Sequence, residues 1–197
     1  CLMLSVMDNA MNELRSIVMR ADSKWTDTGI PRVSMVKAEA CANQVYQPML
    51  HLVLQGSKSL IIAGNIFNYD AATYFVVPVD VPATGEIYAD GPDLPYQAVS
   101  LALDPDVIAT LLDEDSNATG GHERQSMSCF SAVTAPAEMI DAWLRMMRLI
   151  ERPGEAAVLA PMIEREILFR AMQGPLREVL YDIACPDGRL SQIRRAI

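Results

Sequence analysis

Residues able to bind a metal ion or move protons are scarce in this chain and far apart in the sequence. The only two histidines are His51 and His122. A metal-dependent enzyme of the β-barrel type needs several imidazoles and a carboxylate that converge on one ion. His122 follows Gly120-Gly121 in a polar stretch, where we expect it to be solvated. His51 lies in an apolar stretch, so we interpret it as a hydrogen-bonded core residue or a ligand contact, and we expect no metal site.

Nucleophilic and phosphate chemistry are not indicated either. No Gly-x-Ser-x-Gly turn is present, and Gly120-Gly121 is not followed by the Lys-Ser/Thr of a phosphate-binding loop. Glu164 and Glu166 are two residues apart, so on a helix they point to different sides. The four cysteines, which form no C-x-x-C pair and which we expect to be reduced structural thiols, are Cys1, Cys41, Cys129 and Cys185. The sequence therefore predicts no enzyme and no cofactor.

Small-molecule binding fits the residue types better. Ligand cavities are mostly apolar with a few convergent polar groups, and the mouths of β-barrels are common places for them. Side chains alternate along a strand, which places His51 with Val53 on one face and Tyr96 with Ser100 on another. If these faces point inward, the ligand contacts are His51, Tyr74, Tyr96 and Ser100. The opposite register, with these side chains pointing outward, remains open.

The elements that must position these residues are short strands separated by turns. The predicted strands cover residues 33–38, 50–55, 60–63, 66–69, 74–79, 85–89 and 96–103, with turns at 56–58 and 64–65. Strands of this length at this spacing, with no helical pattern between them, are typical of an antiparallel barrel or sandwich. A further strand or irregular segment is predicted over 126–133, after a polar loop at 113–125.

Helical patterns lie on both sides of this region. Apolar residues three and four apart predict helices over 5–21, 136–150, 159–172 and 176–183. A shorter helix is predicted over 105–112, because Asp104 suits the N-cap position and Pro105 the first helical position. The fold class is therefore α+β: a cupin-like antiparallel β-barrel or sandwich followed by an antiparallel helix hairpin.

The two long C-terminal helices have apolar residues on more than one stripe. A helix at the edge of one core needs only one stripe. The wider apolar surface favours a second contact, with another copy of the chain, although a hairpin buried within one monomer stays open. The predicted dimer interface consists of Met139, Trp143, Met146, Met147, Ile150, Ile163 and Ile167.

Length and composition limit the remaining possibilities. The chain has 197 residues, 51% of them hydrophobic, so it is long and apolar enough for one folded domain. No apolar run reaches the roughly 18 residues of a membrane-spanning helix. The net charge of −9 argues against nucleic-acid binding by the chain as a whole. We expect a cytoplasmic protein without a membrane partner.

Taken in order, these segments resemble the N-terminal regulatory domain of AraC-type transcription regulators. The similarity covers about residues 30–197. Its residues are 48–58 (PMLHLVLQGSK), Gly64 with Tyr69, 76–82 (VVPVDVP), 92–96 with 101–105, Arg152-Pro153, 158–170, Gly174-Pro175 and 190–197. Near Gly174-Pro175 the chain is shorter than the family pattern, which leaves the helix register there open.

The resemblance implies a cupin-like barrel that senses a small molecule, followed by helices that form a homodimer. It also implies a C-terminal helix-turn-helix domain that binds DNA and is absent from this chain. We expect three parts: residues 1–28 as an N-terminal helix and lead-in, 29–133 as the barrel, and 134–197 as the dimerisation helices and the start of the linker. Two alternatives remain, a ligand-independent dimerisation module and a cupin-type enzyme.

Overall fold

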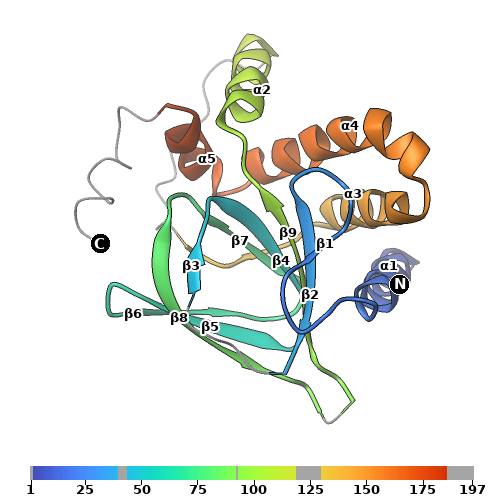
Figure 1. Ribbon diagram of the computed structural model, residues 1–197. Coiled ribbons are helices and arrows are strands. Elements are labelled where there is room, and N and C mark those ends of the chain that lie inside the picture. Colours follow the sequence, from blue (N-terminus) through green and yellow to red (C-terminus); the bar gives the residue numbers. More distant parts are fainter. Residues whose placement is uncertain (1, 40–43, 92, 119–129, 186–197) are drawn as a thin grey trace.

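The computed structural model describes residues 2–39, 44–91, 93–118 and 130–185. Within these residues the strands form two antiparallel sheets (Figure 1). The six-stranded sheet has the order β1 (Thr26–Asp27), β2 (Val33–Ala38), β9 (Tyr96–Ala102), β4 (Met49–Gln55), β7 (Thr73–Val77), β10 (Val133–Thr134). The four-stranded sheet has the order β3 (Gln44–Tyr46), β8 (Val81–Tyr88), β5 (Ser57–Ile62), β6 (Asn65–Tyr69). The predicted α+β class with an antiparallel sandwich is confirmed; in the described part the two sheets do not join into one closed barrel.

Strand β4 shows why the six-stranded sheet is buried on both faces. Leu50, Leu52 and Leu54 belong to one core cluster, shared with the helices. Val53, from the intervening positions, belongs to a second cluster shared with the four-stranded sheet. A strand covered on both faces reads as a continuous apolar run rather than an alternating one, which explains why β4 is almost entirely apolar.

Helices cover the outer face of the six-stranded sheet. Helix α1 (Leu2–Val18) packs on β4, β9 and α3 (Ala137–Arg148), and α3 packs on α4 (Pro153–Met172) after the short 3-10 turn Leu149–Glu151. The remaining helices, α2 (Pro105–Ala118) and α5 (Arg177–Ala184), pack on each other. In Figure 1, α1, α3 and α4 lie together on the side of the sheet that faces away from β5, β6 and β8. No helix of the described residues is long and apolar enough to cross a membrane.

Several boundaries differ from the sequence prediction. The predicted turn at 56–58 is confined to Gly56, which has φ +71°, and Ser57 and Lys58 already belong to β5. A Cβ atom at position 56 would collide with the carbonyl oxygen of Tyr88, so this turn needs glycine. Helix α2 extends to Ala118, which makes residues 113–118 helical instead of part of a loop.

Three elements begin elsewhere or were not predicted. Helix α4 starts at Pro153 rather than 159, because Pro153 is well suited to the first helical position. The strands β1 and β3 are two and three residues long, too short for a periodic pattern to show. Of the segment predicted over 126–133, residues 126–129 lie outside the described residues.

Candidate functional site

His51 lies on the inner face of β4, between the two sheets. Its side chain is fully buried, and its Nε2 is 2.8 Å from the hydroxyl oxygen of Tyr96. The imidazole stacks on Phe75 with ring centroids 4.7 Å apart, and the edge of Trp25 meets it at 5.3 Å. Burial, and secondly the positive charge of Lys58, hold the pKa of His51 well below its ordinary value of 6.5. The imidazole is therefore neutral at pH 7.

One polar atom of His51 is left without a partner. Among the described residues, none offers a hydrogen bond to His51 Nδ1. A neutral imidazole has one donor nitrogen and one acceptor nitrogen, and the contact with Tyr96 decides which role remains for Nδ1. In either tautomer, this buried nitrogen can form one hydrogen bond to a bound molecule.

Two further predicted contacts lie beside His51 because of strand pairing. Ser100 of β9 is directly opposite His51 in the antiparallel register, so the two side chains share a face. Tyr96 is on the same strand and is 2% exposed. Alternation along β9 places Tyr96 on the same face as Ala98 and Ser100, and Tyr96 belongs to the cluster between the sheets. The structure thus brings His51, Tyr96 and Ser100 together.

Tyr74 does not join them. It pairs with Leu52 and belongs to the cluster between the six-stranded sheet and the helices. Burial raises the pKa of its hydroxyl to about 12, and a Cβ atom at Gly174 would lie 3.0 Å from that oxygen. Phe75, one residue later, is the β7 residue that reaches His51. The grouping of Tyr74 with His51 is therefore corrected.

Lys58 was not predicted as part of this site. Its side chain is on the inner face of β5, 3% exposed, with Nζ 4.6 Å from the ring centroid of Tyr46 and 5.9 Å from that of Tyr96. An ammonium over an aromatic face is attracted by the quadrupole of the ring, whose face is partially negative. Lys58 alternates with Leu60 and Ile62, a pattern that indicates a shared inner face. The sequence prediction missed it because Lys58 was assigned to a turn. We define the inner-face cluster as His51, Lys58, Tyr96 and Ser100.

The predicted dimer interface lies almost entirely inside the monomer. Met139, Trp143, Met146, Met147, Ile163 and Ile167 are each at most 8% exposed, and Ile150 packs against the same core. Their neighbours are α1, the outer face of the sheet and the other helix of the hairpin. A side chain buried within its own chain cannot also contact a second chain, so this interface assignment is corrected.

A different stripe of α4 is exposed. Its apolar side chains are Val158 and Met162, 66% and 63% exposed, together with the less exposed Leu159 and Phe169. Val158, Met162 and Phe169 are four and seven residues apart, which places them on one face of the helix, with Leu159 at its edge. Helix α4 thus has two apolar faces, as the sequence indicated. The face that is exposed and could contact a second chain is not the face predicted from the sequence.

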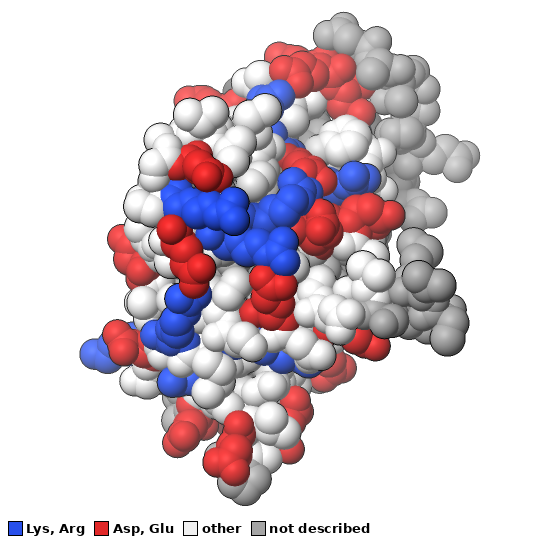
Figure 2. Space-filling model, turned by 90° about the vertical axis from the view of Figure 1, so that its right-hand side faces the viewer, with Lys and Arg blue, Asp and Glu red and all other residues white. Residues whose placement is uncertain are grey.

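The surface over α1, α3 and α4 carries both charges. Figure 2 shows Lys and Arg side chains gathered on one side of the molecule, with Asp and Glu side chains among them. Ion pairs join these helices: Arg148 to Glu13 at 2.7 Å and Arg145 to Glu166 at 2.7 Å. The positive charges of Arg145 and Arg148 on this face are therefore offset by neighbouring carboxylates.

The family is decided by comparison with known sequences. Residues 29–179 match the family model described as the AraC-type transcriptional regulator N-terminus. The chain belongs to this family. The resemblance stated from sequence motifs is therefore confirmed for most of the chain, while residues 190–197 and His122 lie outside the described residues.

Two AraC-type regulators are among the solved structures similar to this AraC-type chain. Apo ToxT K231A from Vibrio cholerae strain SCE256 matches with a TM-score of 0.51 at 6% identity, over 73% of this chain and 56% of that one. The AraC-like transcriptional activator CuxR matches with a TM-score of 0.44 at 11% identity, over 76% of this chain and 53% of that one. The chain therefore spans little more than half the length of these regulators. No curated protein matches it.

Proposed function

We propose that this AraC-type chain is the effector-sensing part of a transcription regulator, binding a small molecule between its two sheets. The observation that carries the proposal is the buried His51, whose Nδ1 has no hydrogen-bond partner among the described residues. Leaving a buried polar atom unpaired costs about 1–3 kcal/mol, and a ligand group that forms a hydrogen bond with Nδ1 would recover it. Tyr96 and Ser100 supply further polar contacts on the same face, and the Lys58 ammonium supplies one from the facing sheet.

The inner-face cluster suits binding rather than catalysis. Within the described residues no group of three or more His, Cys, Asp or Glu could hold a metal ion. A neutral imidazole hydrogen-bonded to a tyrosine and packed against the rings of Phe75 and Trp25 can orient a ligand. The proposed activity is therefore regulatory: ligand binding shifts the population between two arrangements of the chain and changes DNA binding by a domain elsewhere in the full regulator.

We also propose that the chain forms a homodimer through the exposed stripe of α4. In an antiparallel pairing of two α4 helices that sets Val158 opposite Met162, Glu155 of one copy lies opposite Arg165 of the other. The apolar residues then meet at the centre and unlike charges meet beside them, which favours a second copy of this chain as the partner. Exposed apolar stripes of this kind mark protein interfaces.

One observation favours a second candidate, a dimerisation module that senses nothing. The rings of Tyr69 and Phe75 stack at 3.7 Å, and Leu60 and Val77 are fully buried, so side chains of the chain itself fill much of the space between the sheets. A sandwich filled in this way needs no ligand for stability.

A thermal-shift screen separates the two candidates. The chain is mixed with a library of small organic acids, sugars and aromatic metabolites, because a ligand that binds only the native state raises Tm. A hit must lose its effect in Tyr96→Phe and keep it in Tyr88→Phe, a matched control whose hydroxyl is on the exposed side of β8. Hits that stabilise both variants equally contradict the site, and a library without hits favours the second candidate.

The dimer is tested by light scattering with size-exclusion chromatography. Met162→Glu places a charge in the centre of the proposed interface and is expected to give a monomer. Val6→Glu is the matched control, since Val6 on α1 has the same exposure, 63%, as Met162. Equal dimerisation of the two variants would exclude the α4 stripe.

A further inference from the structure

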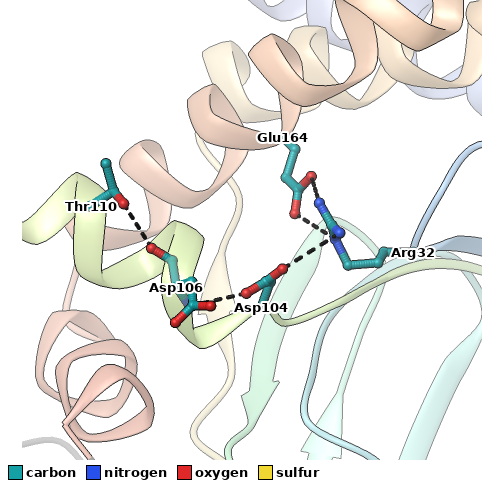
Figure 3. A network of polar contacts seen from close by, with 5 residues as sticks. All are labelled: Arg32, Asp104, Asp106, Thr110 and Glu164. Carbon is teal, nitrogen blue, oxygen red and sulfur yellow. Dashed lines mark hydrogen bonds and ion pairs between the residues drawn. The ribbon is translucent and has the colours of Figure 1, made fainter.

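An ion-pair network joins the sandwich to α4 at Arg32 (Figure 3). The guanidinium donates from Nε to Glu164 Oε1 at 3.0 Å and from Nη2 to Glu164 Oε2 at 2.5 Å. Its Nη1 lies 3.6 Å from Asp104 Oδ2. One side chain from the turn before β2 thus contacts a carboxylate of α4 and another at the start of α2.

The backbone of Arg32 is held by strand β9. Arg32 has φ +66°, in the left-handed region that residues with a side chain seldom adopt. Its carbonyl oxygen accepts a hydrogen bond of 2.8 Å from the N–H of Ala102, the last residue of β9. Such strain persists only where surrounding contacts fix it. A displacement of β9 is therefore passed directly to Arg32.

The position of α4 depends on the ion pair between Glu164 and Arg32. The carboxylate is 4% exposed, although α4 presents Val158 and Met162 to solvent on another face. Buried carboxylates are stable when paired and strongly destabilising when left alone. Asp104, the alternative partner of Arg32, follows β9 by two residues and accepts the N–H of Asp106 at 3.0 Å, which caps α2. The guanidinium is therefore shared between two carboxylates, one on α4 and one at the start of α2.

We propose that Arg32 is the coupling residue that passes a change at the inner-face cluster to α4. When β9 shifts at Tyr96 and Ser100, the end of the strand at Ala102 and the following Asp104 move as well. Arg32, which is bound to both, moves with them. Its guanidinium then loses the two hydrogen bonds to Glu164 and pairs with Asp104 instead. Helix α4 then changes its position on the sandwich. The meaning of this movement as an effector signal rests on the proposed function, but the coupling itself is a property of this fold.

Hydrogen exchange in a double-mutant cycle tests the coupling without a ligand. Tyr96→Phe removes the hydroxyl that contacts His51, and the exchange rates of α4 amides are measured relative to those of α1, so that a change in global stability cancels. Coupling networks contribute enough energy for Tyr96→Phe to change the relative rate by about threefold to tenfold. In the Glu164→Gln background the same change is expected to have almost no effect on α4.

Arg145→Gln is the matched control. Arg145 also joins α4 to another element, α3, through Glu166 at 2.7 Å, but it does not touch the turn that holds Arg32. The effect of Tyr96→Phe must persist in this background. An undiminished effect in Glu164→Gln overturns the proposal, as does the absence of any effect on α4 in the otherwise unaltered chain.

A second variant covers the case in which Glu164→Gln does not fold. Arg32→Lys keeps the positive charge but loses the two-pronged geometry, and it is expected to remove the coupling as well. Full coupling in Arg32→Lys would contradict the assignment. Because neither an effector nor a dimer is needed, this result is independent of the thermal-shift screen and of light scattering.

Discussion

Replacing Arg32 allows two opposing contributions to stability to be measured: the ion pair with Glu164, which stabilises the fold, and the left-handed backbone conformation, which destabilises it. Arg32→Ala leaves the buried Glu164 carboxylate unpaired, a change that costs about 3–5 kcal/mol for a fully buried pair. The Arg32 side chain is 36% exposed, so solvent screens part of the interaction, and we expect a loss of about 3 kcal/mol. Arg32→Gly loses the same pair but removes the left-handed strain at φ +66°, which is worth about 1 kcal/mol. We therefore expect Arg32→Gly to be the less destabilised variant.

The assay is urea denaturation at 25 °C followed by circular dichroism, at several protein concentrations so that dimerisation is accounted for. The expected free energies of unfolding fall in the order unaltered chain, Arg32→Gly, Arg32→Ala. At most positions in folded proteins glycine is the worse of the two residues, so this order is specific to the left-handed conformation. If Arg32→Ala lowers the free energy of unfolding by less than about 0.5 kcal/mol, as is typical of surface changes, the claim that the buried Glu164 carboxylate needs Arg32 as its partner is refuted.

Three other predictions follow from named contacts. Gly56→Ala is expected to lower the free energy of unfolding by more than Gly64→Ala in the same urea assay, because both have positive φ but only Gly56 faces a backbone oxygen; equal losses would contradict this. The depressed pKa of His51 means that the unfolded chain binds the extra proton more readily, so stability is full above about pH 6.5 and falls as the pH drops below it. His51→Gln should flatten that dependence when unfolding is measured from pH 8 to 5, and an unchanged slope would count against a buried neutral imidazole. Gly174→Ala is expected to lower Tm by pressing on the Tyr74 hydroxyl, with partial recovery in the background Tyr74→Phe; a loss that Tyr74→Phe does not reduce would point to another cause.

The sequence predicted the strands better than their faces. The central strands β4 and β9 are apolar, bounded by turns and long enough to be found from pattern alone. Alternation grouped His51 with Val53 and Tyr96 with Ser100, but both faces of the six-stranded sheet are buried. Nothing in the hydrophobicity of β7 therefore shows whether Tyr74 or Phe75 points inward.

The helices show the same ambiguity. Two apolar stripes on a helix indicate two contacts, but not which of them is made within the chain. The apolar faces that contain Trp143 on α3 and Ile167 on α4 point to the core of the monomer. Val158 and Met162 on α4 remain exposed. The pairing of Arg32 with Glu164 spans 132 positions in the chain, so no local pattern could have predicted it.

The central claim, that a small molecule binds beside His51 and Tyr96, is tested most directly by calorimetric titration. A compound that stabilises the chain in the screen is titrated into the unaltered chain and into His51→Ala and Tyr96→Ala. Each lost hydrogen bond to a buried group should weaken binding by about tenfold. Unchanged affinity in both variants would contradict the account.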